Sequence, residues 1–293
     1  MPTAVVRSPA ALIPAQPQRL WGWPAVLNFT LGGMGAGLYA TAVLAAGLGR
    51  PPAVAWATWI APLLVLAGFA AVAGEAGRPL RGPRVLWRVR TSWMSRELWL
   101  GGAFVLFAVA DIAFPLRLHR AQALVAAALF VVAQGFILRC ARGVAAWNVA
   151  RMPWLFALSA AVSGVGLYLV LEAVTGRPIP ETAFLAGIAV LVVSLQAGRA
   201  YLATPAGHAF RDATGSFRDG LAGRVIVGVG LALPAAALAV ALVAPAAITA
   251  PAALAAGLAM IAGQVSFKAE LILRAGLLRP ITVASLRMPR RPS

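Results

Sequence analysis

The chain has 293 residues, of which 61% are hydrophobic and only 11% are charged, and its mean hydropathy is +0.85. This composition excludes a soluble globular domain, which needs more polar surface, and it indicates a polytopic membrane protein. The net charge of +17 comes from basic residues that lie between apolar runs. It therefore predicts topology signals beside anionic lipid and no nucleic-acid partner.

Eight apolar runs are long enough to cross about 30 Å of hydrocarbon at about 1.5 Å per residue. They cover residues 24–48, 53–74, 97–116, 121–140, 154–175, 183–203, 224–244 and 247–271. None alternates like a transmembrane strand, and open strands cannot span a bilayer. The sequence therefore predicts an all-α polytopic transmembrane bundle of about eight helices over 23–276, with an N-terminal tail (1–22) and a basic C-terminal tail (277–293).

The first run carries two features that bear on packing and binding. Gly33 and Gly37 form a small-xxx-small pair, which predicts close approach of a neighbouring helix. Asn28 lies about one turn below the membrane surface, where its amide needs a partner. The sequence leaves open whether that partner is a ligand or another helix.

The segment from Glu75 to Glu97 joins the second and third runs and reads EAGRPLRGPRVLWRVRTSWMSRE. We interpret it as the working end of the protein, where the bundle meets a small lipid-soluble substrate and a soluble partner. Glu97 is either a first-turn carboxylate, with Ser92 or Ser95 as the helix cap, or a functional acid. Glu75 is either a solvated helix end, a partner for Arg78, or part of the same site.

Asp111 follows Glu97 by 14 residues, about 21 Å along the same predicted helix. We expect it within the hydrocarbon, where a carboxylate is costly and should face the interior of the bundle. Two interpretations stay open. One is a proton relay from Asp111 toward the site at Glu97. The second is a protonated Asp that is hydrogen-bonded to a neighbouring helix.

The other acidic residues and the metal-binding residue types suggest no further site. We expect Glu270 to pair with Arg274 one turn on, and the polar segment 204–223 to be a loop with solvated ion pairs. Cys140 is the only cysteine, and His119 and His208 both fall in predicted loops. The sequence therefore predicts neither a metal site nor a haem in this chain. The acids interpreted without a function are Glu172, Glu181, Asp212, Asp219 and Glu270.

Basic residues are distributed unevenly between alternate connections of the bundle. Twenty-one lie on the side that holds both tails and the 75–97 segment, and four lie on the other side. The positive-inside rule then places both termini and this segment in the cytoplasm, with the bundle in the cell inner membrane.

Several segments resemble a known family. SWMSRE (92–97) resembles the S-W-x-S-R-E signature of dimethyl-sulfoxide-reductase-type (DmsC-like) quinol-oxidoreductase anchors, and GEAGRPLR (74–81) is similar to the motif that ends their second helix. WPAVLNFTLGGMGAG (23–37) resembles the first helix of the related polysulfide-reductase and NrfD-type anchors. ARGVAAWN (141–148) and FKAELILRAG (267–276) are similar to later segments of the family.

The resemblance implies a membrane anchor that binds quinone or quinol, either menaquinone or ubiquinone. Its partners would be a four-cluster iron–sulfur subunit and a molybdopterin catalytic subunit, which would hold all the clusters and the molybdenum cofactor. Glu97 would be the carboxylate beside the quinone, and Glu75 stands where relatives often carry His. A carboxylate there can take a proton from a quinol hydroxyl. Around the two acids we expect quinone-binding residues at Asn28, Arg78, Trp87, Trp93, Ser95 and Arg96.

The sequence leaves two other functions open. A secondary transporter would show inverted repeats and broken helices around a polar site at the midplane. A structural anchor without quinone chemistry would tolerate replacement of Glu75 and Glu97 without loss of turnover.

Overall fold

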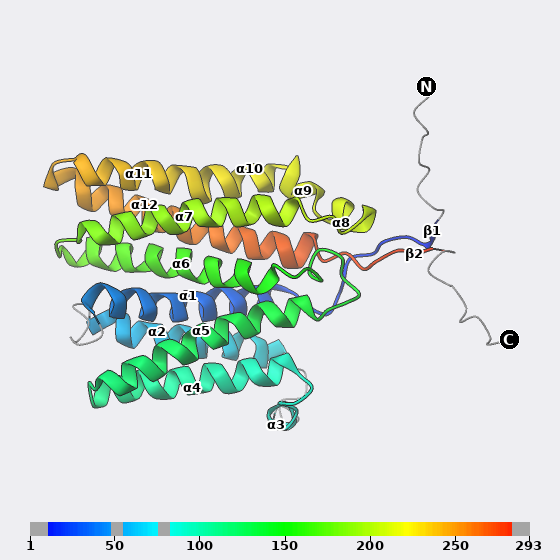
Figure 1. Cartoon of the computed structure of the whole chain (residues 1–293), viewed down its shortest axis with the longest axis horizontal. Coiled ribbons are helices and arrows are strands. Elements are labelled where there is room, and N and C mark those ends of the chain that lie inside the picture. Colours follow the sequence, from blue (N-terminus) through cyan, green and yellow to red (C-terminus); the bar gives the residue numbers. More distant parts are fainter. Residues whose placement is uncertain (1–10, 48–54, 76–82, 283–293) are drawn as a thin grey trace.

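The apolar runs form long helices because a backbone inside hydrocarbon must satisfy its own hydrogen bonds. The computed structural model of the chain describes residues 11–47, 55–75 and 83–282. Its long helices lie side by side with nearly parallel axes (Figure 1). They are α1 (Trp23–Ala46), α2 (Ala55–Glu75), α4 (Trp93–Ala113), α5 (Arg117–Arg139), α6 (Met152–Thr175), α7 (Glu181–Leu202), the composite span Leu221–Val243 and α12 (Ala246–Ala269).

The predicted all-α polytopic bundle of about eight helices is confirmed. Within the part of the chain that the structure describes, seven helices are long and apolar enough to cross a membrane. The remaining long helix, α4, packs along α5 and α2, and it carries Arg96, Glu97 and Asp111 among its 21 residues. Its length and packing make it the eighth long helix of the bundle.

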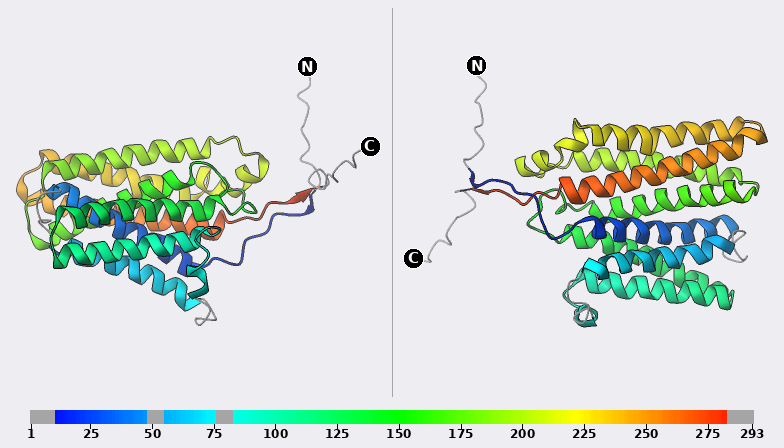
Figure 2. Two further views of the ribbon diagram at one scale, coloured as in Figure 1. Left: turned by 60° about the horizontal axis from the view of Figure 1, so that its bottom comes forward. Right: turned by 180° about the vertical axis from the view of Figure 1, so that it is seen from behind.

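Helix α1 is the centre of the bundle. It contacts α2, α5, α6 and α12, and most of its residues are buried. Both chain ends leave the bundle at the side where α1 begins, and we call this side the termini end (Figure 2). The opposite side, where α1 ends at Ala46, is called the far end. Because α1 lies in the middle, its polar residues are placed between the two halves of the bundle.

Small residues set the closest helix contacts. A Cβ atom on Gly37 would collide with the carbonyl oxygen of Ala160, and one on Gly164 would collide with the backbone of Gly37. A Cβ atom on Gly33 would lie 3.5 Å from the Cβ atom of Ala160. The predicted close approach at Gly33 and Gly37 is therefore confirmed, and α6 is the neighbouring helix.

Prolines and glycines delimit several helices. Pro115 follows the end of α4, and Pro153 lies in the first turn of α6, where its missing N–H costs no helical hydrogen bond. Gly176 ends α6 with a φ of 67°, in the left-handed region that glycine adopts without strain. Pro234 offers no N–H to its helix, and the turn before it is π-helical: η2 (Gly228–Ala232) lies between α10 (Leu221–Val227) and α11 (Leu233–Val243).

The polar segment 204–223 was wrongly predicted as a loop. It contains α8 (His208–Ala213), α9 (Gly215–Arg218) and the start of α10. Arg218 donates to the carbonyl of Leu202 and to the hydroxyl of Thr214. Backbone and hydroxyl acceptors thus hold an arginine that was expected to pair with an aspartate.

The two tails meet beside the termini end. Strand β1 (Ala11–Ile13) pairs antiparallel with β2 (Ile281–Thr282), and the N–H group of Gln18 donates to the carbonyl of Gly276. Helix α12 continues into the π-helical turn η3 (Glu270–Arg274), where Glu270 and Arg274 form the predicted pair at 3.6 Å. A short helix, α3 (Pro83–Leu86), lies beside the start of α4.

Candidate functional site

Glu97 lies in a polar cluster that three helices form near the termini end. Ser92 is the N-cap of α4 and its hydroxyl accepts from the N–H of Ser95, so Glu97 lies beyond the first turn. Ser92 is thus one of the two predicted caps, whereas the placement of Glu97 in the first turn is wrong. Its side chain is buried, and its Oε1 accepts from Asn28 Nδ2 on α1 at 2.9 Å and from Gln134 Nε2 on α5 at 3.1 Å.

The cluster has more acceptors than donors. Both amides donate to the same oxygen of Glu97, which leaves Oε2 for another donor. The oxygens Asn28 Oδ1 and Gln134 Oε1 are buried and accept no hydrogen bond. A buried polar atom left without a partner costs about 1–3 kcal/mol, so the cluster is suited to a ligand or solvent molecule that donates.

A cavity of about 270 Å³ opens beside this cluster. Its wall is mainly apolar, with Glu97 and Asn28 as its polar members, and Leu20 and Met94 are 85% and 44% exposed. An apolar pocket with a few polar groups is the usual form of a small-molecule site. The cavity is lined by Leu20, Trp21, Ala25, Asn28, Phe29, Val72, Met94, Glu97 and Ile137.

The other residues of the 92–97 motif build the frame around Glu97. Trp93 stacks on Phe136 of α5, with ring centroids 4.3 Å apart. The hydroxyl of Ser95 donates to the carbonyl of Val85, and Arg96 donates to the carbonyl of Val89 at 2.9 Å.

Arg96 also lies over the ring of Trp93, 4.2 Å from its centroid. These contacts hold the 85–90 segment against α4 and fix the start of that helix. The motif thus combines one carboxylate at the cavity with several residues that position it.

The structure brings only some of the predicted quinone-binding residues to the cavity. Asn28 and Glu97 line it, whereas Trp93, Ser95 and Arg96 do not. Trp87 is 84% exposed and is also absent from the cavity wall. Arg78 lies outside the described residues, and Glu75 ends α2 with a side chain that the structure does not describe.

Two residues of this site were not identified from the sequence: one lines the cavity and the other holds Glu97. Trp21 precedes the first apolar run and supplies the aromatic wall that was expected from Trp87 and Trp93. Gln134 is fully buried in α5 and donates to Glu97. An amide in the middle of the apolar run 121–140 was the available signal, because an amide in hydrocarbon needs a partner.

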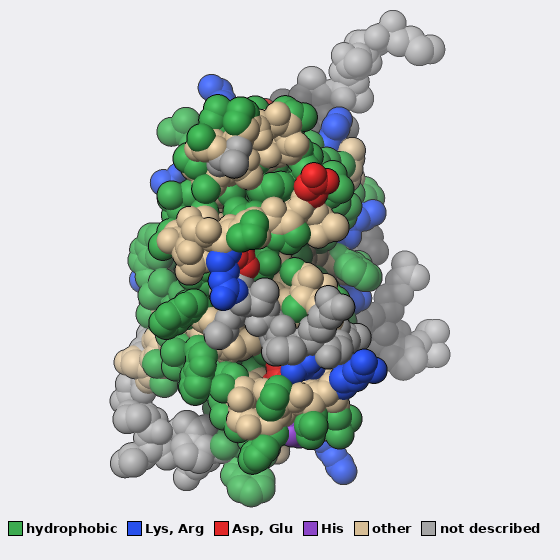
Figure 3. All heavy atoms as spheres, turned by 90° about the vertical axis from the view of Figure 1, so that its left-hand side faces the viewer, with side chains coloured by type: hydrophobic (Ala, Val, Ile, Leu, Met, Phe, Trp, Pro, Cys, Tyr) green, Lys and Arg blue, Asp and Glu red, His purple; other side chains and the backbone are tan. Residues whose placement is uncertain are grey.

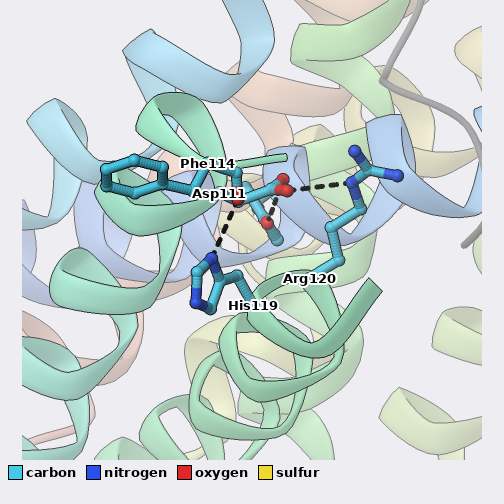
Figure 4. A network of polar contacts seen from close by, with 5 residues as sticks. Asp111, Phe114, His119 and Arg120 are labelled. Atoms are coloured by element: carbon cyan, nitrogen blue, oxygen red, sulfur yellow. Dashed lines mark hydrogen bonds and ion pairs between the residues drawn. The ribbon is translucent and has the colours of Figure 1, made fainter. Parts of the chain in front are cut away.

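Asp111 belongs to a second polar cluster at the far end of the bundle, near the end of α4. Its Oδ1 accepts from Arg120 Nε at 2.9 Å, and its Oδ2 accepts from the hydroxyl of Tyr39 at 2.9 Å. All three residues are buried, and Figure 4 shows the arginine reaching the carboxylate from α5. The neighbouring-helix partner is therefore an arginine. A proton relay from Asp111 toward Glu97 stays a prediction.

Two histidines lie in settings other than those predicted, and two acids interpreted without a function are buried. His119 is in the first turn of α5, with its Nδ1 2.9 Å from the carbonyl oxygen of Phe114, and His208 begins α8. Neither is in a loop. Glu172 and Glu270 are buried, at 2% and 6% exposed. Across residues 11–47, 55–75 and 83–282, no group of three His, Cys, Asp or Glu side chains is placed to hold a metal ion.

The fold and this cluster define a multi-pass membrane protein with a buried carboxylate at a mainly apolar cavity near one end of the bundle. The family model described as DMSO reductase anchor subunit (DmsC) matches residues 19–217, about two thirds of the chain. The chain therefore belongs to the DMSO reductase anchor subunit family. No curated protein matches it.

As a member of this family, the chain is the membrane anchor of a DMSO reductase-type complex, which implies a catalytic subunit and an iron–sulfur subunit as partners. The matched residues include Trp21, Asn28, Glu97 and Gln134, so the whole cluster lies inside the family region.

Proposed function

We propose that this anchor binds quinol in the cavity beside Glu97 and that Glu97 accepts a proton from the quinol hydroxyl. The observation that carries the proposal is the buried carboxylate at a mainly apolar cavity, held by two neutral amides. A lipophilic ring fits the apolar wall, with Trp21 and Phe29 as aromatic neighbours. The excess of acceptors in the cluster favours quinol, the form whose hydroxyls donate.

The chemistry divides between this chain and its partners. Oxidation of one quinol to quinone releases two protons and two electrons. Glu97 would receive one proton through Oε2, because Oε1 already accepts twice. The other proton would leave to solvent at the exposed rim of the cavity beside Leu20 and Met94. We propose that the electrons pass to a four-cluster iron–sulfur subunit and then to a molybdopterin catalytic subunit, without a haem in this chain.

The termini end is the proposed docking side for these partners. The cavity lies there, so a quinol bound in it would be near a subunit that covers this end. Exposed arginines also gather there, whereas Figure 3 shows scattered charged side chains on the mainly hydrophobic far end. With the positive-inside rule, this proposal places both termini in the cytoplasm and the bundle in the inner membrane. The exposed arginines at the termini end are Arg19, Arg88, Arg90, Arg142, Arg151, Arg199, Arg211, Arg218, Arg224, Arg274 and Arg279, and those at the far end are Arg117 and Arg177.

The test is binding of a fluorescent hydroxyquinoline N-oxide inhibitor to the assembled complex, with wild type compared with Glu97→Gln. Glutamine keeps the volume and an acceptor for Asn28, but it cannot take a proton. We expect saturable quenching in wild type, its loss in Glu97→Gln, and a fall in quinol turnover of about 100-fold or more. The matched control is Glu181→Gln, because Glu181 is an exposed carboxylate at the far end.

Three outcomes would count against the proposal. Absence of saturable binding in wild type would remove the quinol site and leave a structural anchor. Unchanged turnover in Glu97→Gln would separate this carboxylate from the chemistry. Equal losses in Glu97→Gln and Glu181→Gln would mean that the effect is not specific to the cavity.

A further inference from the structure

Lys268 is the one lysine in a chain with 25 basic residues, and it is wholly buried. Its ammonium group donates to the carbonyl of Phe29 at 2.6 Å and lies 5.6 Å from the ring centroid of Phe156. A Cβ atom on Gly33 would come within 3.1 Å of Nζ, so the glycine leaves the room that the amine occupies. The amine is thus enclosed between α1, α6 and α12.

An enclosed ammonium within a membrane bundle is costly, and such a residue is a functional candidate by default. The two ion pairs of the described residues are Asp111 with Arg120 and Glu270 with Arg274. Lys268 belongs to neither. Its long side chain does not reach the surface as lysines near helix ends usually do. The amine therefore remains inside the bundle, beside α1.

Lys268 and the Glu97 cavity meet at consecutive residues of α1. The amine bonds the carbonyl of Phe29, and the side chain of Phe29 lines the cavity. The preceding residue, Asn28, donates to Glu97. A buried positive charge and a buried carboxylate thus flank the same turn of α1, with the cavity on the carboxylate's side.

We propose that Lys268 is a positioning residue whose charge stabilises negative charge on a ligand in the Glu97 cavity, and this inference rests on the proposed function. A quinol oxygen becomes negative when its proton leaves, and a fixed cation in surroundings of low dielectric favours that charge. Lysine suits this place better than arginine, because it is a compact point charge and the space beside Gly33 is small. The ligand class it favours is a lipophilic ring with an acidic hydroxyl.

A structural role must be separated from this electrostatic one. The hydrogen bond to the carbonyl of Phe29 needs a donor but no charge. Lys268→Gln offers a donor without the charge, and Lys268→Met keeps similar length without either. Arg117→Gln is the matched control, because it removes a positive charge from an exposed side chain at the far end, away from the cavity and the proposed docking side.

The experiment compares two probes on the assembled complex: a hydroxyquinoline N-oxide with a free acidic hydroxyl, and the same compound with that hydroxyl methylated. We expect Lys268→Gln to weaken binding of the acidic probe about tenfold, equivalent to about 1.4 kcal/mol. Binding of the methylated probe should change less than about twofold, and Arg117→Gln should affect neither. The proposal is overturned if Lys268→Gln and Lys268→Met weaken the binding of both probes equally, or if they weaken the binding of neither probe.

A second measurement needs no variant: ¹⁵N-lysine labelling of this chain alone, before assembly with unlabelled partners, gives a single side-chain signal from its one lysine. We expect this signal to shift on saturation with the acidic probe and to move much less with the methylated one. An unchanged signal with both overturns the inference. Suppose that wild type binds both probes, that Glu97→Gln binds neither, and that Lys268→Gln still binds both. Then only the proposed role of Lys268 fails, and the quinol site stands. If wild type binds neither, the quinol site fails as well.

Discussion

Helix α4 carries two buried carboxylates, one toward each end of the bundle, and they are held in opposite ways. Glu97 accepts from two neutral amides and borders a cavity of about 270 Å³. Asp111 accepts from the guanidinium of Arg120 and the hydroxyl of Tyr39, one donor on each oxygen. The first carboxylate keeps an oxygen for a further partner, whereas each oxygen of the second has a protein donor.

Under the proposed function, this difference separates a site for chemistry from a structural contact. An acid that exchanges a proton must tolerate both charged and neutral forms, and amide partners compensate a charge only in part. An acid that faces a buried arginine is needed in its charged form, because losing it leaves a cation in the interior. The following three variants test whether the two ends of α4 divide their roles in this way.

The largest effect on stability is expected from Asp111→Asn. It removes the carboxylate that faces the buried guanidinium of Arg120, so we expect a loss of about 3–5 kcal/mol in the free energy of unfolding. Thermal unfolding of the purified protein measures this loss. The double variant Asp111→Asn with Arg120→Met should recover much of it. A stable Asp111→Asn protein with lost turnover would instead support the proton relay that the sequence suggested.

An intermediate effect, on binding and not on stability, is expected from Gln134→Leu. The variant removes one of the two donors to Glu97, so the carboxylate is less well oriented. We expect inhibitor affinity to fall about tenfold, or about 1.4 kcal/mol, in a fluorescence titration. Gln264→Leu is the matched control, because Gln264 is also buried but lies on α12 and is absent from the cavity wall. Equal losses in both variants would contradict a specific role for Gln134.

The smallest effect is expected from Tyr39→Phe. The change removes one hydrogen bond to Asp111 and leaves the contact with Arg120 in place, so we expect a loss of about 1 kcal/mol or slightly more. Tyr201→Phe is the control, since its hydroxyl donates to the carbonyl of Ala146, a neutral acceptor. Both are measured by thermal unfolding. Lower turnover in Tyr39→Phe at unchanged stability would mean that the far end takes part in the chemistry.

The sequence by itself determined the class of fold. Apolar runs of membrane-spanning length predict helices, because hydrocarbon offers the backbone no other partner. The same reasoning placed the close contact at Gly33 and Gly37, since only small residues let two helix backbones approach. Asn28 and Glu97 were recognisable as candidates because polar side chains in such a chain need partners. The segment 204–223 was wrongly predicted, because its short helices depend on contacts beyond their own residues.

The tertiary structure decided which polar residues meet. Gln134 reaches Glu97 across 37 positions of the chain, and Lys268 reaches the carbonyl of Phe29 across 239. No local sequence pattern predicts such pairings, because they depend on which faces of the helices pack together. The same packing leaves Trp87 exposed and places Trp21 at the cavity. Composition and periodicity decide that a residue is in a membrane helix, whereas packing decides whether its side chain meets a ligand, a counter-ion or lipid.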